Sequence, residues 1–326
     1  MPLFDLPQAE LERHRTAAPE PEGLDAFWAD AIAVARAAAA APVLTPYRPD
    51  AYRALEVFDV TFSGADGHPI KAWYLRPREA STTPLPCRVT FVGYGGGRDH
   101  AAAHALYPAS GYATFVMDTR AQGGNWSTGA TPDPGAGDSG PEHPGVMTRG
   151  IASPHTYYYR RLYVDAVRAV ETVAALPGVD SARIGVAGGS QGGALARAAA
   201  ALAPDHVALC HADVPFLCDI ERAMDITPDA PYTELVKYLS VHPELEEQAR
   251  VTLRHVDNAL LATRIRAQTL VSVGLRDTIC PPSTVYAAFN AIAAPKEIAV
   301  LPFSGHETNT AHVERQLAAF TAAFAG

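Results

Sequence analysis

The sequence predicts an α/β protein built on a mostly parallel, doubly wound sheet with an antiparallel hairpin at one edge. Two adjacent segments alternate apolar and polar residues, which is typical of half-buried antiparallel strands. From residue 88 onward, short apolar runs alternate with segments of helical periodicity, the pattern of repeated β-α units. Of the 326 residues, 48% are hydrophobic and 19% are charged, which suits one large buried core.

Helices are expected before the first strand. Segments 8–15 and 24–40 both have helical spacing, and in the second the apolar positions include Leu24, Phe27 and Trp28. We therefore expect residues 1–50 to form a helical extension of a single domain that spans residues 1–326.

The sheet is predicted to begin with a hairpin. Residues 55–63 and 69–75 alternate, and the segment 64–67, Gly-Ala-Asp-Gly, supplies the turn between them. The β-α units that follow contain expected strands at 88–92, 112–117, 183–187, 206–212, 268–273 and 297–301, and expected helices at 100–110, 155–175, 194–202, 283–293 and 308–324.

Two segments interrupt this alternation. Residues 119–150 are rich in Gly, Pro, Ser and Asp and have no periodicity, and so long a loop is usually functional or packed against a partner. Residues 215–264 are mostly polar and helical and lie between two strands. We expect this second segment to be a helical cap over the carboxyl end of the sheet.

Composition excludes several classes of protein. The formal net charge of −9 argues against a nucleic-acid partner, and the alanine run at 37–41 is too short to cross a membrane. The first residues lack the basic start and apolar core of a signal peptide. No pair of cysteines forms a C-x-x-C motif, so we expect reduced, packed thiols and a cytoplasmic protein; the cysteines are Cys87, Cys210, Cys218 and Cys280.

The segment 188–193, Gly-Gly-Ser-Gln-Gly-Gly, contains a G-x-S-x-G motif centred on Ser190. It lies between an expected strand and an expected helix, which is the context of a nucleophile elbow. Gly188 and Gly192 leave room for the tight turn, and the helix N-terminus directs free N–H groups toward developing negative charge. The structural alternative is a small-residue turn that packs a helix against the sheet.

A base and an acid follow Ser190 in the chain order expected for such a triad. Asp277 and His306 each come just after the carboxyl end of an expected strand, where ligand-facing groups collect in parallel sheets. We assign Ser190 as nucleophile, His306 as general base and acid, and Asp277 as the group that fixes the imidazole tautomer. Asp213 is the alternative acid, although we expect its carboxylate to be buried and tied to the backbone.

An oxyanion hole requires two N–H donors. One is expected from Gln191, the residue after the nucleophile, and the other from Tyr94 in the glycine-rich segment 93–97. The alternative, a phosphate-binding loop, lacks the lysine of a P-loop and the spacing of a dinucleotide fingerprint. His100 and His104 are one helical turn apart, but no glutamate or third ligand accompanies them, so we expect neither a metal site nor a cofactor.

Seven stretches together resemble family seven of the carbohydrate esterases, the acetyl xylan esterases and cephalosporin-C deacetylases. They include counterparts of the family's R-G-Q, G-x-S-Q-G and H-E motifs, and they lie at 116–123, 145–151, 156–161, 187–193, 213–218, 277–285 and 306–307. The resemblance implies an α/β-hydrolase fold and assigns the same triad and oxyanion donors as the strand order does.

The resemblance also assigns substrate-binding and structural residues. It implies that Tyr94, Phe216, Pro231 and Ile279 bind the substrate, the last three lining a small pocket that favours acetyl over longer acyl groups. Arg120 and Gln122 belong to the R-G-Q motif, which supports the active site in the family. The glycine of that motif is Ala121 here, and a backbone with positive φ would strain an alanine.

By resemblance, the chain is expected to be a serine carboxylesterase that removes O-acetyl groups from small substrates such as acetylated xylo-oligosaccharides and cephalosporin C. The family resemblance implies a homo-oligomer, a hexameric ring with the long loop and the cap as candidate contacts. One alternative is a serine peptidase of the oligopeptidase type, which we disfavour because only about fifty residues precede the first expected strand. Another is a non-catalytic binding protein, although such proteins usually lack a triad member and none is missing here.

Overall fold

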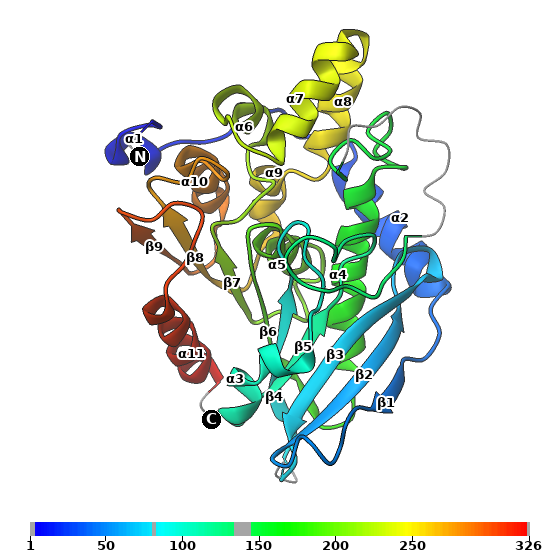
Figure 1. Cartoon of the computed structure of the whole chain (residues 1–326). Coiled ribbons are helices and arrows are strands. Elements are labelled where there is room, and N and C mark those ends of the chain that lie inside the picture. The colour runs from blue at the N-terminus through cyan, green and yellow to red at the C-terminus, as the bar shows by residue number, and fades with distance from the viewer. Residues whose placement is uncertain (1–3, 80–82, 134–144, 325–326) are drawn as a thin grey trace.

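A nine-stranded sheet forms the centre of the computed structural model, which describes residues 4–79, 83–133 and 145–324. The strands lie in the spatial order β1-β2-β3-β5-β4-β6-β7-β8-β9 (Figure 1). They are β1 (Val43–Pro46), β2 (Leu55–Ser63), β3 (Pro69–Pro77), β4 (Leu85–Phe91), β5 (Ala113–Met117), β6 (Val179–Gly189), β7 (Leu209–Asp213), β8 (Gln268–Gly274) and β9 (Lys296–Leu301).

The predicted fold class is confirmed. The strands β5, β4, β6, β7, β8 and β9 pair in parallel with their neighbours in this order. The remaining pairs, β1 with β2, β2 with β3 and β3 with β5, are antiparallel. The expected hairpin is the pair β2 and β3, and β1 extends it as an additional edge strand. The sequence did not predict β1 because it has only four residues, ends in a proline and has no residue that is fully buried.

Helices cover both faces of the sheet. The helix α4 and the helix α5 pack against β4 and β6 and against each other, and α2 packs on the outside of α4. On the other face, α3 and α11 meet where the ring centroids of Tyr107 and Phe320 lie 5.3 Å apart. These helices are α2 (Leu24–Ala37), α3 (Leu106–Ala109), α4 (Tyr158–Ala174), α5 (Gln191–Leu202) and α11 (Thr310–Phe324).

The expected cap is a group of short helices above the carboxyl ends of the strands, with α7 and α8 uppermost in Figure 1. The remaining helices are α1 (Gln8–Leu11), α6 (Ile220–Ile226), α7 (Tyr232–Val241), α8 (Glu246–Arg254), α9 (Asn258–Leu261) and α10 (Pro282–Ala291), with single 3-10 turns η1 (Ala65–Gly67), η2 (Ala101–His104), η3 (Pro243–Leu245) and η4 (Ala262–Arg264).

The helix expected at 100–110 is divided into η2 and α3. Pro108 has no N–H to donate to the carbonyl of His104, so a continuous α-helical ladder cannot pass this point. The helix expected at 8–15 ends at Leu11, and the one expected at 24–40 ends at Ala37. These differences lie at helix ends and leave the topology unchanged.

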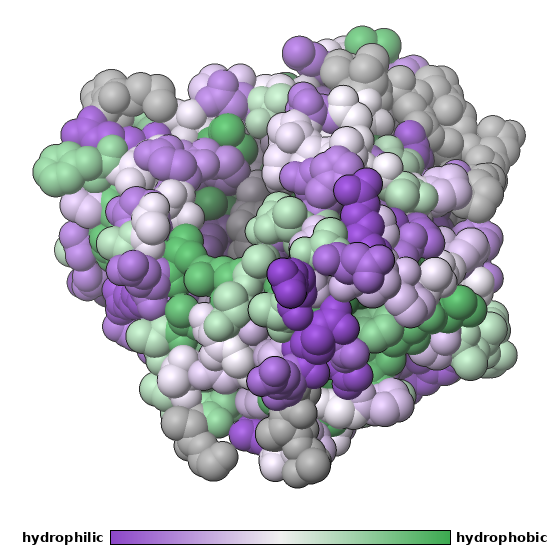
Figure 2. All heavy atoms as spheres, turned by 60° about the horizontal axis from the view of Figure 1, so that its bottom comes forward, coloured by the Kyte–Doolittle hydropathy of each residue, from purple (hydrophilic) through white to green (hydrophobic). Residues whose placement is uncertain are grey.

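All four cysteines are buried free thiols, as the sequence indicated. Among the helices that the structure describes, none is long and apolar enough to cross a membrane. Figure 2 turns the bottom of Figure 1 toward the viewer, and polar and apolar residues are interspersed over the face that it shows.

Candidate active site

Ser190 occupies the turn between β6 and α5. Its backbone has φ 56° and ψ −120°, a region that L-residues rarely adopt, so the turn must be held by its surroundings. The Ser190 N–H donates to the carbonyl of Asp213 at 2.8 Å, and the Ser190 carbonyl accepts from the N–H of Phe216 at 3.0 Å. The strained backbone lifts the hydroxyl above the carboxyl edge of the sheet.

The two glycines of the G-x-S-x-G motif are required by close backbone contacts. A Cβ on Gly188 would lie 2.4 Å from the carbonyl carbon of Gly192, and a Cβ on Gly192 would lie 2.3 Å from the oxygen of Phe91. Real Cβ atoms do not approach backbone so closely, so no other residue fits at either position. This is the geometry that a nucleophile elbow demands.

Asp277 and His306 come together above the ends of β8 and β9. His306 Nδ1 and Asp277 Oδ2 are 2.8 Å apart, and the other carboxylate oxygen accepts from the N–H groups of Ile279 at 2.9 Å and Cys280 at 2.8 Å. Asp277 is fully buried. Because Nδ1 donates to this fixed carboxylate, Nε2 is left as the basic nitrogen of the ring.

Ser190 and His306 line the same cavity, but within the described chain no hydrogen bond joins Ser190 Oγ to His306 Nε2. The thiol of Cys280 lies close to the other two groups, with its sulfur within 4.8 Å of a ligand atom of Asp277 and of His306. Burial, and then the nearby Asp277, raise the pKa of Cys280 well above its usual range, so the thiol stays neutral. Hydrogen bonds between nucleophile and base are often long before substrate binds.

The alternative acid, Asp213, has other partners. Its Oδ1 accepts from Ser272 Oγ at 3.0 Å and lies 2.7 Å from His312 Nε2, and its Oδ2 accepts from Gln316 Nε2 at 2.9 Å. The expected ties from this carboxylate to the backbone are therefore replaced by side chains of β8 and α11. Asp213 still supports the nucleophile, because its own carbonyl holds the Ser190 N–H.

Tyr94 and Gln191 flank the nucleophile on the side of β4. Tyr94 lies in the glycine-rich loop after β4, and Gln191 is the first residue of α5. The loop and the helix are joined by Gln122, whose Oε1 accepts from the Gly95 N–H at 2.7 Å and whose Nε2 donates to Gln191 Oε1 at 2.9 Å. Gln191 Nε2 in turn donates to the carbonyl of Val92 at 3.2 Å. The glutamine of the R-A-Q motif thus fixes the spacing between the two expected oxyanion donors.

Arg120 anchors the same motif in the core. Its guanidinium is fully buried and donates to Asp165 through Nε at 2.6 Å and Nη2 at 2.7 Å, and to Asp133 at 3.0 Å. Burial opposes the charge, but the two carboxylates outweigh it and raise the pKa of Arg120. Burial also raises the pKa of Asp165, yet the bidentate geometry favours the ionised pair.

Ala121, which replaces the family glycine, has φ 58°. The sequence raised this conformation as a possibility, and the structure adopts it. The Ala121 N–H donates to the carbonyl of Thr131 at 3.0 Å, which holds the strained residue in place between Arg120 and Gln122. The backbone therefore keeps a conformation that favours glycine although the residue has a side chain.

The cavity above Ser190 has a volume of about 900 Å³. Of the four residues expected to bind substrate, Tyr94, Pro231 and Ile279 line it. Phe216 does not line it: the side chain is fully buried, and its ring centroid lies 4.4 Å from that of Tyr232. The expectation that Phe216 is part of the pocket wall is corrected here, because this ring supports the cap from behind the wall.

Glu234 on α7 joins the cap to the glycine-rich loop that contains Tyr94. The sequence did not indicate a role for Glu234. The Tyr94 hydroxyl donates to the Glu234 carboxylate at 2.7 Å and accepts from the N–H of Val146 at 2.9 Å. The N–H of Met147 donates to Glu234 at 3.2 Å. Burial and then Glu234 raise the pKa of Tyr94, so the phenol stays protonated. A lone glutamate in a polar helix gives no sequence signal of such a role.

Among the residues that the structure describes, possible metal ligands come together beside His306. Among the described residues, one group of three such side chains has ligand atoms within 4.8 Å of one another, namely Asp277, Cys280 and His306. Two of these already form the hydrogen-bonded pair, and the third is a neutral thiol. The His104 Nε2 lies 2.7 Å from the carbonyl of Arg98, so this ring is engaged with the backbone rather than paired with His100.

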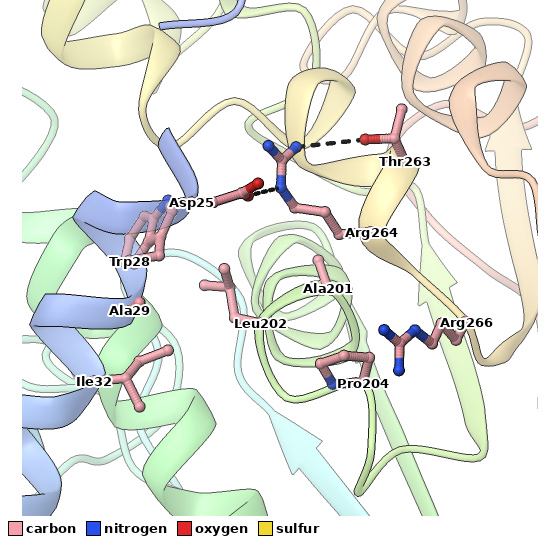
Figure 3. Close-up of a pocket in the computed structure, with 10 residues that line it drawn as sticks. All are labelled: Asp25, Trp28, Ala29, Ile32, Ala201, Leu202, Pro204, Thr263, Arg264 and Arg266. Atoms are coloured by element: carbon pink, nitrogen blue, oxygen red, sulfur yellow. Dashed lines mark hydrogen bonds and ion pairs between the residues drawn. The ribbon is translucent and has the colours of Figure 1, made fainter. Parts of the chain in front are cut away.

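A second hollow, of about 370 Å³, lies between α2, the end of α5 and η4 (Figure 3). Its lining includes Trp28, Leu202 and Arg264, and the Arg264 guanidinium donates to Asp25 at 2.5 Å. It shares no lining residue with the cavity above Ser190. The side chains labelled in Figure 3 include no serine, cysteine or histidine.

Comparisons with known proteins place the chain among solved esterase structures. A solved acetyl xylan esterase from Paenibacillus sp. R4 matches with a TM-score of 0.91 and 35% identity over 97% of this chain and 99% of that chain. Acetyl xylan esterase 1 from Thermoanaerobacterium sp. JW/SL YS485 matches with a TM-score of 0.90 and 31% identity over 98% of this chain and 100% of that chain.

A curated relative, acetyl esterase Axe7A of Xylanibacter ruminicola, is 33% identical over 167 residues. This match covers 51% of the present chain and 37% of that protein, so the chain corresponds to little more than a third of the relative's length. The family model described as acetyl xylan esterase (AXE1) matches residues 1–324. The resemblance seen in the sequence motifs is confirmed, and the chain belongs to the acetyl xylan esterase (AXE1) family.

Proposed function

We propose that this protein is a serine carboxylesterase that removes O-acetyl groups from small substrates through an acetyl-enzyme intermediate. The observation that carries the proposal is the His306–Asp277 pair, 2.8 Å apart, on the same cavity as a serine in a strained elbow. The names of the relatives support the acetyl group as the acyl part.

The first half of the reaction forms the acetyl-enzyme. Ser190 Oγ attacks the acetyl carbonyl carbon while His306 Nε2 accepts the hydroxyl proton, and Asp277 stabilises the imidazolium through Nδ1. The N–H groups of Tyr94 and Gln191 donate to the oxyanion. As the intermediate collapses, the bond to the sugar oxygen breaks, and His306 returns its proton to that oxygen, releasing the alcohol.

The second half removes the acetyl group. A water molecule attacks the ester carbonyl of acetyl-Ser190 while His306 accepts one of its protons, and a second tetrahedral intermediate forms in the same oxyanion hole. When this intermediate collapses, the proton returns to Ser190 Oγ and acetic acid leaves. In both halves of the reaction, each N–H donor of the oxyanion hole typically contributes a hundred- to a thousandfold in rate, about 3 kcal/mol.

The acyl side of the cavity supports a preference for acetyl. Pro231 and Ile279 line the cavity above Ser190, and we propose that these rigid and branched side chains border the acyl group and exclude longer acyl chains. Acetylated xylo-oligosaccharides and cephalosporin C both carry an acetyl ester on a small alcohol, and we propose both as substrates.

A cytoplasmic homo-oligomer, a hexamer, remains our proposal for the state of the protein. The residues 134–144, which form part of the long loop expected to contact other subunits, lie outside the described residues. Light scattering coupled to size-exclusion chromatography measures the mass directly. A monomer at micromolar concentration would contradict the oligomer without affecting the proposed chemistry.

The decisive experiment is a series of esters measured by titrating the released acid at constant pH. We expect activity on ethyl acetate, acetylated xylobiose and cephalosporin C, with a steep fall from acetate to butyrate and longer acids. Ser190→Ala is the matched inactive control. Faster turnover of long acids would contradict the acetyl preference, and turnover of a peptide amide in place of esters would indicate a peptidase.

A further inference from the structure

Trp126 is an exposed indole at the mouth of the catalytic cavity. It lies in the loop after Gln122, lines the same cavity as Ser190 and His306, and is 61% exposed. The other two tryptophans of the chain, Trp28 and Trp73, are only 2% and 5% exposed. What distinguishes this indole from other exposed apolar side chains is its position on the lining of the cavity that contains Ser190, where it can contact a bound ligand.

The indole is held in place from one side. Its Nε1–H donates to the carbonyl of Tyr94 at 2.7 Å. A Cβ on Gly96 would lie 2.3 Å from Cζ2 of the indole, and a Cβ on Gly93 would lie 3.4 Å from the same atom. The ring therefore lies directly against the glycine-rich loop, where the missing side chains make room for it, and its orientation does not depend on a ligand.

Polar side chains share the cavity with the indole. Asn125, Ser127, Glu307 and Thr308 line the same cavity. Asn125 is exposed, and its side-chain amide makes no hydrogen bond within the described chain. A flat aromatic surface in the same cavity as this unbonded amide matches a sugar ring, which presents a row of weakly positive C–H groups on its face and hydroxyl groups at its edge.

We propose that Trp126 is the platform on which the sugar ring of the substrate stacks, so that Trp126 selects sugar acetates over simple acetates. The proposal rests on the function proposed above and deepens it by naming the class of leaving group. The acetyl group is small compared with a cavity of about 900 Å³, so most of this space is left for the alcohol part of the ester.

The indole would act on both binding and chemistry. Its face binds the leaving group, whereas its N–H fixes the carbonyl of Tyr94, the residue whose own N–H is the proposed oxyanion donor. Two variants separate these contributions. Trp126→Leu removes both, and Trp126→Phe keeps a flat aromatic face but loses the hydrogen bond to Tyr94.

The first experiment compares an acetylated methyl xyloside with ethyl acetate, which has no ring. In Trp126→Leu we expect the ratio of kcat/KM for the two substrates to fall about tenfold, the scale of a lost apolar contact in a binding pocket. In Trp126→Phe we expect kcat to fall for both substrates alike and the ratio to stay within about threefold of wild type. Phe303→Leu, a change of an 84% exposed aromatic residue outside the cavity lining, is the control.

The second experiment detects binding without turnover. In Ser190→Ala, acrylamide quenches the fluorescence of exposed tryptophan, and Trp126 is the exposed one of the three. We expect acetylated xylobiose to protect this fluorescence from quenching in a saturable manner, and ethyl acetate to give no protection. The melting temperatures of all variants establish that they are folded.

The outcomes are distinct. An unchanged ratio in Trp126→Leu, or no protection by acetylated xylobiose in a protein that hydrolyses acetate esters, overturns the stacking platform and leaves the esterase intact. Quenching that is absent without ligand would show that a second copy of the chain covers the indole, which also overturns it. Loss of all esterase activity in the wild-type protein would instead contradict the proposed function.

Discussion

Ala121→Gly should stabilise the protein, although it removes a methyl group. Ala121 has φ 58°, and holding an L-residue in this left-handed region costs about 1–2 kcal/mol. Glycine removes that cost but increases the entropy of the unfolded chain, which offsets about 0.4–1 kcal/mol. The net expectation is a gain of about 0.5–1 kcal/mol in the free energy of unfolding.

The assay is urea unfolding followed by circular dichroism, with the variant and the wild type measured side by side. The matched control is Ala33→Gly, at an exposed position inside α2, where the same change should cost about 1 kcal/mol because the backbone is helical. The two substitutions are chemically identical, and the opposite signs isolate the effect of φ.

Ala121→Gly should also leave kcat nearly unchanged, since Arg120 and Gln122 on either side stay tied to Asp165 and to Gly95. A destabilisation of the same size as in Ala33→Gly would refute the reasoning. That result would mean that the strain is already relieved by the surroundings, or that the backbone at this position has a negative φ in solution.

Three further substitutions test two supports of the site, Gln122 and Glu234, and one buried histidine on β7, His211. Gln122→Ala should lower kcat about ten- to a hundredfold with a smaller change in KM, because the Gly95 N–H loses its acceptor beside the oxyanion hole. Steady-state kinetics that show a raised KM with an unchanged kcat would contradict this. His211 is buried, and burial, then Arg88, lower its pKa from 6.5 to about 3, so the folded protein keeps the ring neutral while the unfolded chain takes up a proton below about pH 6.5. Stability should therefore fall as the pH falls from about 6.5 toward 3, and His211→Gln should reduce the loss measured by urea unfolding between pH 7 and pH 5 by about 2 kcal/mol; an unchanged loss would show that other groups carry it. Glu234→Leu should lower stability by about 2 kcal/mol, since the Tyr94 hydroxyl and a backbone N–H lose their buried acceptor, and should raise KM through the loosened cap; a melting temperature equal to that of wild type would argue against the contact.

Local patterns predicted the fold because the information lies in short segments. The strand, G-x-S-x-G and helix order identified the elbow, and Gly188 is required by its contact with Gly192, which is close in the chain. The His306–Asp277 contact could also be anticipated, because parallel strands deliver the residues after their carboxyl ends to the same edge of the sheet.

Other features depend on contacts that no local pattern encodes. Glu234 and Tyr94 are 140 residues apart, and their hydrogen bond follows from how the cap folds back onto the loop. The side-chain partners of Asp213 come from β8 and α11, so its environment could not be read from its neighbours in sequence. The inward position of Phe216 likewise depends on Tyr232, a residue of the cap.

The most direct test of the account is to quench the reaction with acid during the first turnovers of 4-nitrophenyl acetate and to analyse the peptides by mass spectrometry. We expect one acetyl group on the peptide that contains Ser190, and neither the adduct nor turnover in Ser190→Ala. Turnover at the wild-type rate without Ser190, or an acetyl group found on a different nucleophile such as Cys280, would contradict it.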